Sequence, residues 1–194
     1  MESPPSGASS VHIWQLLALV VSLAALAGSL YLSVWMNLKA CPLCIYERTF
    51  MMGVVGILLL GWVPSGAAGS GLPVLLSLPL AIGGLGVAAF HVYLELAGVL
   101  ECPAGLGGVG SAPLQSLAAF VVVTVLIGMA VFRSARGATG RITGVGAAIL
   151  GVLFAGAALV SAPPLPPHPA EPYVAPLDGC RPSVQPGGQT GQSP

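Results

Sequence analysis

The residues of this chain that could carry chemistry are four cysteines, two of which stand in the sequence Cys41-Pro42-Leu43-Cys44. With Cys41 as N-cap and Pro42 at the first helical position, the unpaired backbone N–H groups of a helix start would point toward the sulfurs. Together with the positive end of the helix, they lower a thiol pKa and give the thiolate that performs disulfide exchange. Arg48 follows Cys44 by four residues, on the same helical face, where a guanidinium can stabilise a thiolate or a reduced electron acceptor.

A CxxC motif has two other interpretations, a structural disulfide and one half of a metal site. A zinc site needs about two further soft ligands nearby, and Cys102 and Cys180 could supply them. The loop after Cys102 lacks histidine, however, and Cys180 lies in a proline-rich tail. Covalent haem is disfavoured because Ile45 follows Cys44 where histidine is required. We therefore predict no metal.

The other two cysteines lie far apart in the sequence. Cys102 precedes a glycine-rich stretch, residues 104–110, that can move. At about 3.1 Å per residue, an extended proline-rich tail could span several tens of ångströms and bring Cys180 back to Cys102. A second, shuttling disulfide is thus geometrically possible, and the alternative is that Cys180 is an accessory or unpaired thiol.

Few other polar residues lie within the apolar runs. His91 and Glu95 form an i, i+4 pair, and a polar side chain in lipid is costly and often functional. Proton handling and simple snorkelling at the boundary are equally good interpretations of the pair. Glu47, Glu101 and Lys39 are expected to be interface or solvent charges.

The composition says what kind of fold must position these residues. Of the 194 residues, 55% are hydrophobic and 6% charged, against about 25% charged in soluble globular domains. Six basic and six acidic residues could not cover a water-soluble surface, and the net charge of zero gives no attraction to polyanions. We therefore expect a membrane protein in contact with lipid and no nucleic-acid partner.

The apolar runs predict five membrane-spanning helices and an all-α, polytopic membrane helical bundle. The expected helices cover residues 13–35, 44–63, 72–96, 113–132 and 142–160. Residues 1–162 would form one transmembrane thiol-oxidoreductase domain, and residues 163–194 a proline-rich tail, extended or disordered, that serves as a tether. A signal peptide is the competing interpretation of the first run, but a basic segment before it is missing and the run continues past the small-residue site.

The arginines orient this bundle. Half of the basic residues lie in one short loop, at Arg133, Arg136 and Arg141, and the positive-inside rule places that loop in the cytoplasm. Counting spans then places the N-terminus inside, and the tail and all four cysteines on the extracytoplasmic side or its membrane boundary. That compartment is oxidising, which suits disulfide chemistry.

The string Cys-Pro-Leu-Cys-Ile-Tyr-Glu-Arg at residues 41–48, with His-Val-Tyr-Leu-Glu at residues 91–95, resembles the bacterial disulfide bond formation protein B family. The resemblance covers residues 11 to about 132 and implies a four-helix redox core in the bacterial inner membrane. It implies that Cys41 and Cys44 are the redox pair beside a bound quinone (ubiquinone or menaquinone), with Arg48 near the ring and His91 a further quinone-proximal residue. The partner it implies is a periplasmic thioredoxin-like dithiol oxidase (DsbA-like).

The sequence departs from the family pattern at the second pair. Members of the family usually have four membrane helices, with both loop cysteines between the third and the fourth. Here that loop holds only Cys102, and a fifth transmembrane helix returns Cys180 to the extracytoplasmic side. We predict that Cys102 and Cys180 complete the catalytic set. The alternatives are a vitamin-K-epoxide-reductase-like quinone reductase and a non-catalytic membrane protein with structural disulfides.

Overall fold

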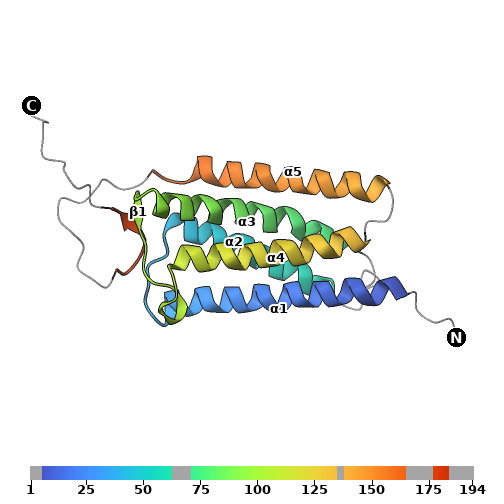
Figure 1. Cartoon of the computed structure of the whole chain (residues 1–194), viewed down its shortest axis with the longest axis horizontal. Helices are drawn as coiled ribbons and strands as arrows, with labels where there is room; N and C mark the ends of the chain where they lie inside the picture. Colours follow the sequence, from blue (N-terminus) through green and yellow to red (C-terminus); the bar gives the residue numbers. More distant parts are fainter. Residues whose placement is uncertain (1–5, 63–70, 135–137, 165–176, 184–194) are drawn as a thin grey trace, which may run out of the picture.

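A computed structural model describes residues 6–62, 71–134, 138–164 and 177–183. Its long helices are α1 (Ser6–Val34), α2 (Pro42–Leu60), α3 (Leu72–Leu96), α4 (Ala112–Ser134) and α5 (Ala138–Ser161). The short elements are the strands β1 (Leu100–Glu101) and β2 (Arg181–Pro182) and the 3-10 helix η1 (Leu106–Gly108). The five long helices lie side by side along the long axis of the molecule (Figure 1).

All five predicted spans are confirmed as helices. Within the described residues, each contains a stretch of 19 to 25 residues that is apolar and long enough to cross a membrane, against about 20 residues needed for the hydrocarbon core. The fold is therefore that of a multi-pass membrane protein. The second helix begins two residues earlier than expected because Pro42 occupies its first position, where its fixed φ suits a helix and no N–H is lost.

Helices α1 to α4 share one apolar core. Val54 of α2, Val74 of α3 and Val123 and Ile127 of α4 are completely buried in it, and Ala18 contributes from α1. Helix α3 is central, since it packs against α2, α4 and α5, while α1 packs against α4 and α2. This arrangement confirms the expected four-helix core.

The fifth helix lies on the outer side of α3 (Figure 1), and two glycines let the helices approach closely. A Cβ on Gly151 of α5 would lie 2.8 Å from the carbonyl oxygen of Pro79 and 2.7 Å from Cβ of Ile82. A Cβ on Gly86 of α3 would lie 2.7 Å from Cβ of Ala155. Small residues at such crossings are typical of helix packing in membranes, where backbone proximity replaces hydrophobic burial as the source of stability.

The two ends of the bundle differ in composition. Arg133 is in the last turn of α4, and its guanidinium lies 5.1 Å from the centre of the Trp14 ring. Arg141 belongs to the first part of α5, and Arg136 lies outside the described residues. The cysteines are at the opposite end, where α2 begins and α3 ends.

Part of the tail is paired with the bundle. Strand β2 pairs antiparallel with β1, with Leu100 opposite Pro182 and Glu101 opposite Arg181, so this part of the tail is extended but bound to the bundle. Residues 177–183 thus return to the bundle, as a bond between Cys180 and Cys102 requires. The expectation that the tail is an extended or disordered tether stays a prediction, and residues 165–176 and 184–194 lie outside the described part of the chain.

Candidate active site

The CxxC motif stands at the start of α2, as predicted. Cys41 is the N-cap with extended backbone (φ −71°, ψ 164°), and Pro42 is the first helical residue. The Cys41 sulfur accepts a hydrogen bond of 3.2 Å from the backbone N–H of Cys44. The two sulfurs are 2.6 Å apart, and both cysteines are free thiols in the structure. The helix start thus holds the pair in a geometry from which a disulfide can form.

The surroundings of Cys41 favour its thiolate. When Cys41 is ionised, the Cys44 thiol can donate a hydrogen bond to its sulfur, and this is the main reason why the pKa of Cys41 is lowered. The backbone N–H of Cys44 acts in the same direction, while burial and the Glu47 carboxylate oppose the shift. Cys41 is therefore the better nucleophile and leaving group of the pair near neutral pH.

The second pair is joined. Cys102 and Cys180 form a disulfide across a sequence separation of 78 residues. Cys102 directly follows β1 and Cys180 directly precedes β2, so the pairing of the two strands brings the two cysteines together. The sequence left open whether Cys180 forms a second disulfide or is an unpaired thiol, and in the structure it forms the disulfide.

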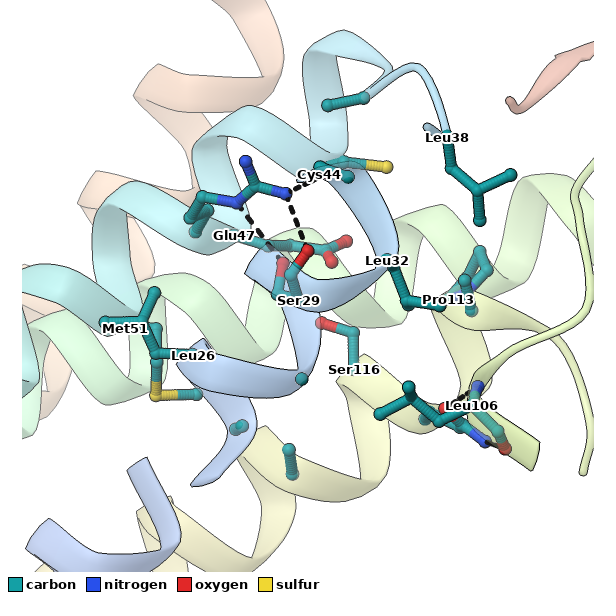
Figure 2. A pocket seen from close by; sticks show the side chains of 18 of the residues that line it. Leu26, Ser29, Leu32, Leu38, Cys44, Glu47, Met51, Leu106, Pro113 and Ser116 are labelled. Carbon is teal, nitrogen blue, oxygen red and sulfur yellow. Dashed lines mark hydrogen bonds between the residues drawn. The ribbon is translucent and has the colours of Figure 1, made fainter. Parts of the chain in front are cut away.

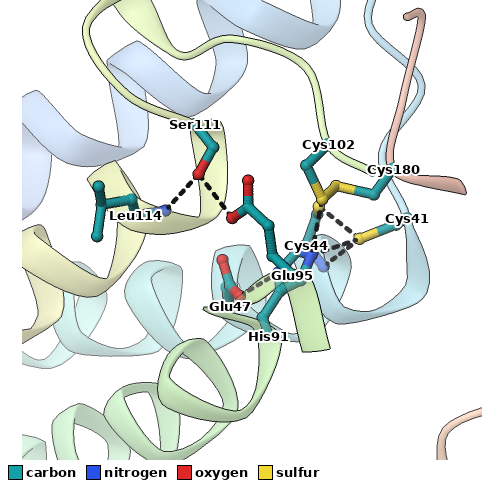
Figure 3. The surroundings of a disulfide bond; sticks show 9 residues. All are labelled: Cys41, Cys44, Glu47, His91, Glu95, Cys102, Ser111, Leu114 and Cys180. Carbon is teal, nitrogen blue, oxygen red and sulfur yellow. Dashed lines mark hydrogen bonds and ion pairs between the residues drawn. A yellow bond between two sulfur atoms is a disulfide. The ribbon is translucent and has the colours of Figure 1, made fainter. Parts of the chain in front are cut away.

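His91 of α3 lies between the two pairs (Figure 3). Its Nε2 is 3.7 Å from the sulfur of Cys41 and 3.7 Å from the sulfur of Cys102. Its Nδ1 is 2.8 Å from Oε1 of Glu47. The His91 side chain is fully buried, and Glu47 is 6% exposed. When Nδ1–H donates to Glu47, a neutral His91 presents an unprotonated Nε2 to both sulfurs.

The structure corrects two sequence interpretations here. Glu47, expected to be an interface or solvent charge, is buried as the partner of His91. Glu95, expected to pair with His91, instead accepts a hydrogen bond of 2.7 Å from the Ser111 hydroxyl. The spacing contained the signal for Glu47, because it follows Cys44 by three residues and so shares its helical face.

Arg48 is anchored to α1. Its Nε donates to the Ser29 hydroxyl at 3.2 Å, and its terminal nitrogen donates to the Ser29 carbonyl at 3.1 Å and to the Ser33 hydroxyl at 2.5 Å. Among the described residues, no hydrogen bond joins Arg48 to a cysteine. The two serines hold the guanidinium in the wall of a cavity. Figure 2 shows this cavity with Ser29, Cys44 and Glu47 among its lining side chains.

This cavity has a volume of about 190 Å³ and lies among α1, α2, α4 and the loop that contains η1. The polar groups in its wall include Cys44, Glu47, Arg48, His91 and Cys180. The remaining wall is mainly apolar and includes Leu26, Leu32, Met51, Leu106, Pro113 and Phe120. A polar edge opposite an apolar surface suits a small amphipathic molecule such as a quinone ring.

The same end of the bundle also contains a set of soft metal ligands. The donor atoms of Cys41, Cys44, His91 and Cys180 all lie within 4.8 Å of one another, which is a donor set that zinc can use. The sulfur of Cys180 is bonded to Cys102, however. The described residues therefore favour exchange between two cysteine pairs over metal binding.

A membrane-spanning bundle with a thiol pair and a disulfide on either side of one buried histidine has the groups that thiol–disulfide exchange needs. Residues 11–162 match the family model described as Disulfide bond formation protein DsbB. The chain belongs to this family.

Relatives named Disulfide bond formation protein B give the same result. The protein of Burkholderia thailandensis is 40% identical over 86 residues, which are 43% of this chain and 49% of the relative. Disulfide bond formation protein B 1 of Pseudomonas aeruginosa is 35% identical over 92 residues, 47% of this chain and 56% of the relative. The chain thus spans about half the length of the curated relatives it matches. No solved structure matches the chain.

Proposed function

We propose that this protein is a quinone-dependent thiol oxidase of the bacterial inner membrane that reoxidises a periplasmic thioredoxin-like dithiol oxidase (DsbA-like). The observation that carries the proposal is His91, whose Nε2 lies 3.7 Å from a sulfur of each cysteine pair. Both pairs are therefore close enough to exchange, and one cysteine of each pair, Cys44 and Cys180, lines the cavity. Membership of the family and the five spans support the assignment.

Electrons enter at Cys102–Cys180. The dithiol of the partner opens this disulfide by exchange, so the partner is oxidised and Cys102 and Cys180 become thiols. The Cys180 thiolate then attacks the sulfur of Cys41 in the Cys41–Cys44 disulfide and releases the Cys44 thiolate. The Cys102 thiolate next attacks Cys180 and releases Cys41. The two electrons of the partner dithiol now reside on Cys41 and Cys44, and the first disulfide is restored.

His91 handles the proton during exchange. Its Nε2 faces Cys41 and Cys102. It accepts the proton of the thiol that attacks and returns a proton to the thiolate that leaves. Glu47 fixes the ring through Nδ1 and stabilises its charged form. The pair works as a carboxylate–histidine unit beside a sulfur nucleophile.

Cys44, Arg48 and His91 would hold the quinone in the cavity, and the apolar wall would enclose its ring. A quinone supplies the acceptor of two electrons and two protons from the Cys41–Cys44 dithiol. The fixed guanidinium of Arg48 favours negative charge at this wall.

The cysteine end faces the periplasm in this proposal, and the N-terminus faces the cytoplasm. Arg133 supports this orientation, because it lies at the end of the bundle opposite the cysteines and basic residues favour the cytoplasmic side.

The test uses the full chain in lipid nanodiscs with a short-chain ubiquinone and a reduced thioredoxin-like dithiol protein. We expect two partner thiols to be lost for each quinone reduced, and no turnover beyond one equivalent of the protein in Cys44→Ser. Thiol loss that continues beyond this equivalent in Cys44→Ser would contradict the scheme. Quinone reduction by a small dithiol without oxidation of the protein partner would favour the reductase alternative, and cysteines that never change state would indicate structural disulfides.

A further inference from the structure

The tail segment that contains Cys180 is bound to the bundle by contacts on both sides of the cysteine. Before it, Oδ2 of Asp178 lies 2.9 Å from Nζ of Lys39, and the Asp178 carbonyl accepts a hydrogen bond from the Lys39 backbone N–H. Asp178 also accepts a hydrogen bond from Arg181. After Cys180, the Ser183 backbone N–H donates to the Val99 carbonyl at 3.0 Å.

Gly179 shows how closely the segment is seated. It is buried and forms a parallel bridge with Lys39. A Cβ on Gly179 would lie 2.6 Å from the carbonyl oxygen of Lys39. Backbone cannot yield as a flexible side chain can, so this approach requires glycine.

These contacts join the segment to the chain just before Cys41 and just before Cys102. Lys39 precedes Cys41 by two residues, and β1 ends directly before Cys102. The sulfur of Cys180 consequently lies within 4.8 Å of the sulfurs of Cys41 and Cys44. None of the contacts includes the Cys102–Cys180 bond itself, so they can persist when that bond opens.

The proposed cycle requires such a hold. After the partner has opened the Cys102–Cys180 disulfide, Cys180 is no longer bonded to Cys102, and its thiolate must still reach Cys41. A cysteine on a free linker would be present near Cys41 only at the effective concentration that the linker allows. A docked segment keeps it at reacting distance.

We infer that residues 177–183 form a docking clamp in which Asp178 and Gly179 hold Cys180 beside Cys41 independently of the Cys102–Cys180 disulfide. Asp178 is then a positioning residue for transfer between the two pairs. The inference rests on the proposed function for its role in the cycle, but the clamp can be tested without quinone or partner.

The test uses full-length Cys44→Ser/Cys102→Ser protein in nanodiscs, in which Cys41 and Cys180 are the remaining cysteines. Diamide accepts the two electrons and two protons that are released when these thiols join. We expect rapid formation of the Cys41–Cys180 bond, measured by gel shift after quenching with maleimide. Asp178→Ala and Gly179→Ala should each slow it by about tenfold, by loss of the effective concentration that docking provides.

Two controls separate positioning from general damage. Asp178→Glu keeps the carboxylate and should restore most of the rate. Gly156→Ala adds a methyl group on α5 where nothing lies within 4 Å, and it should leave the rate unchanged. Equal rates in the parent, Asp178→Ala and Gly179→Ala would overturn the clamp, even if quinone-dependent activity is found. A clear slowing with no quinone-dependent activity would instead keep the clamp and reject the proposed function.

Discussion

The two cysteine pairs are positioned by different means. Cys41 and Cys44 are three residues apart on one helix start, and the N-cap geometry alone places their sulfurs together. Cys102 and Cys180 are separated by 78 residues and meet because two short strands and an ion pair of Asp178 bring the tail to the bundle. The first pair is thus set by local structure and the second by tertiary contacts.

This difference matches the work proposed for each pair. A pair fixed at a helix start keeps its distance to the cavity throughout a reaction cycle. A pair that joins two segments can open, because the backbone contacts that dock these segments do not include the Cys102–Cys180 bond. His91 connects the two, since it touches one sulfur of each.

The largest expected effect is a difference between the two cysteine pairs in which dithiol substrates need them. Cys41→Ser should abolish oxidation of every dithiol. Cys102→Ser should lower turnover of the protein partner by about 100-fold or more, because a covalent step is lost, yet dithiothreitol should still reduce Cys41–Cys44 directly. Initial rates of quinone reduction with each dithiol measure this. If Cys102→Ser blocked both dithiols equally, the pairs would not have separate tasks.

The second effect concerns the histidine between the pairs. Glu47→Ala should lower the free energy of unfolding by about 2 kcal/mol, because it leaves the buried Nδ1–H of His91 without its charged acceptor. Denaturation in detergent monitored by circular dichroism measures it.

The matched control is Glu95→Ala. Glu95 is only half-buried, so water can replace its bond to Ser111 and the loss should be clearly smaller. If both variants lost the same free energy of unfolding, the contact between Glu47 and His91 would contribute no more to stability than the contact between Glu95 and Ser111.

A third effect compares the two ends of the bundle. Arg48→Lys should raise the KM for quinone by about tenfold, since an ammonium cannot reproduce the planar contacts with Ser29 and Ser33 that fix the guanidinium. Arg133→Lys, at the other end, should leave this KM unchanged. If Arg133→Lys raised the KM for quinone and Arg48→Lys left it unchanged, the quinone site would lie at the end of the bundle opposite the cysteines, which would contradict the proposed site.

The smallest effect concerns the pKa of Cys41, which its neighbour Cys44 lowers. A lowered pKa keeps the thiolate as pH falls below the usual thiol range and loses it only as pH falls through the lowered value. In Cys44→Ala the midpoint for alkylation of reduced Cys41 should move to higher pH. Cys44→Ser retains a donor and should shift it less. An unchanged midpoint in Cys44→Ala would remove the hydrogen bond as the cause.

Much of the fold could be predicted because its signals are local. The five apolar runs are long enough to predict the membrane-spanning helices directly. Pro42 after Cys41 predicts the N-cap that the structure has. The length of the tail was enough to predict that Cys180 could reach Cys102 and form a disulfide. These inferences need only chain length, hydropathy and helix-end chemistry.

The contacts that depend on how helices are rotated against each other could not be predicted. Nothing in the sequence near Glu47 says that α3 presents His91 to it, or that Ser29 and Ser33 of α1 receive Arg48. The docking of the tail is equally nonlocal, since Asp178 and Lys39 are distant in sequence. Such partners follow from packing, which composition and periodicity do not specify.

The measurement that tests the central claim most directly is a disulfide map of quinone-free protein in a bilayer. The protein, with both pairs first oxidised, is equilibrated with one equivalent of a reduced dithiol, quenched with acid and alkylated for mass spectrometry. We predict that Cys102–Cys180 is found as a disulfide and that Cys41 and Cys44 are found as thiols, the states seen in the structure. A Cys41–Cys44 disulfide beside free Cys102 and Cys180 would contradict transfer toward the cavity.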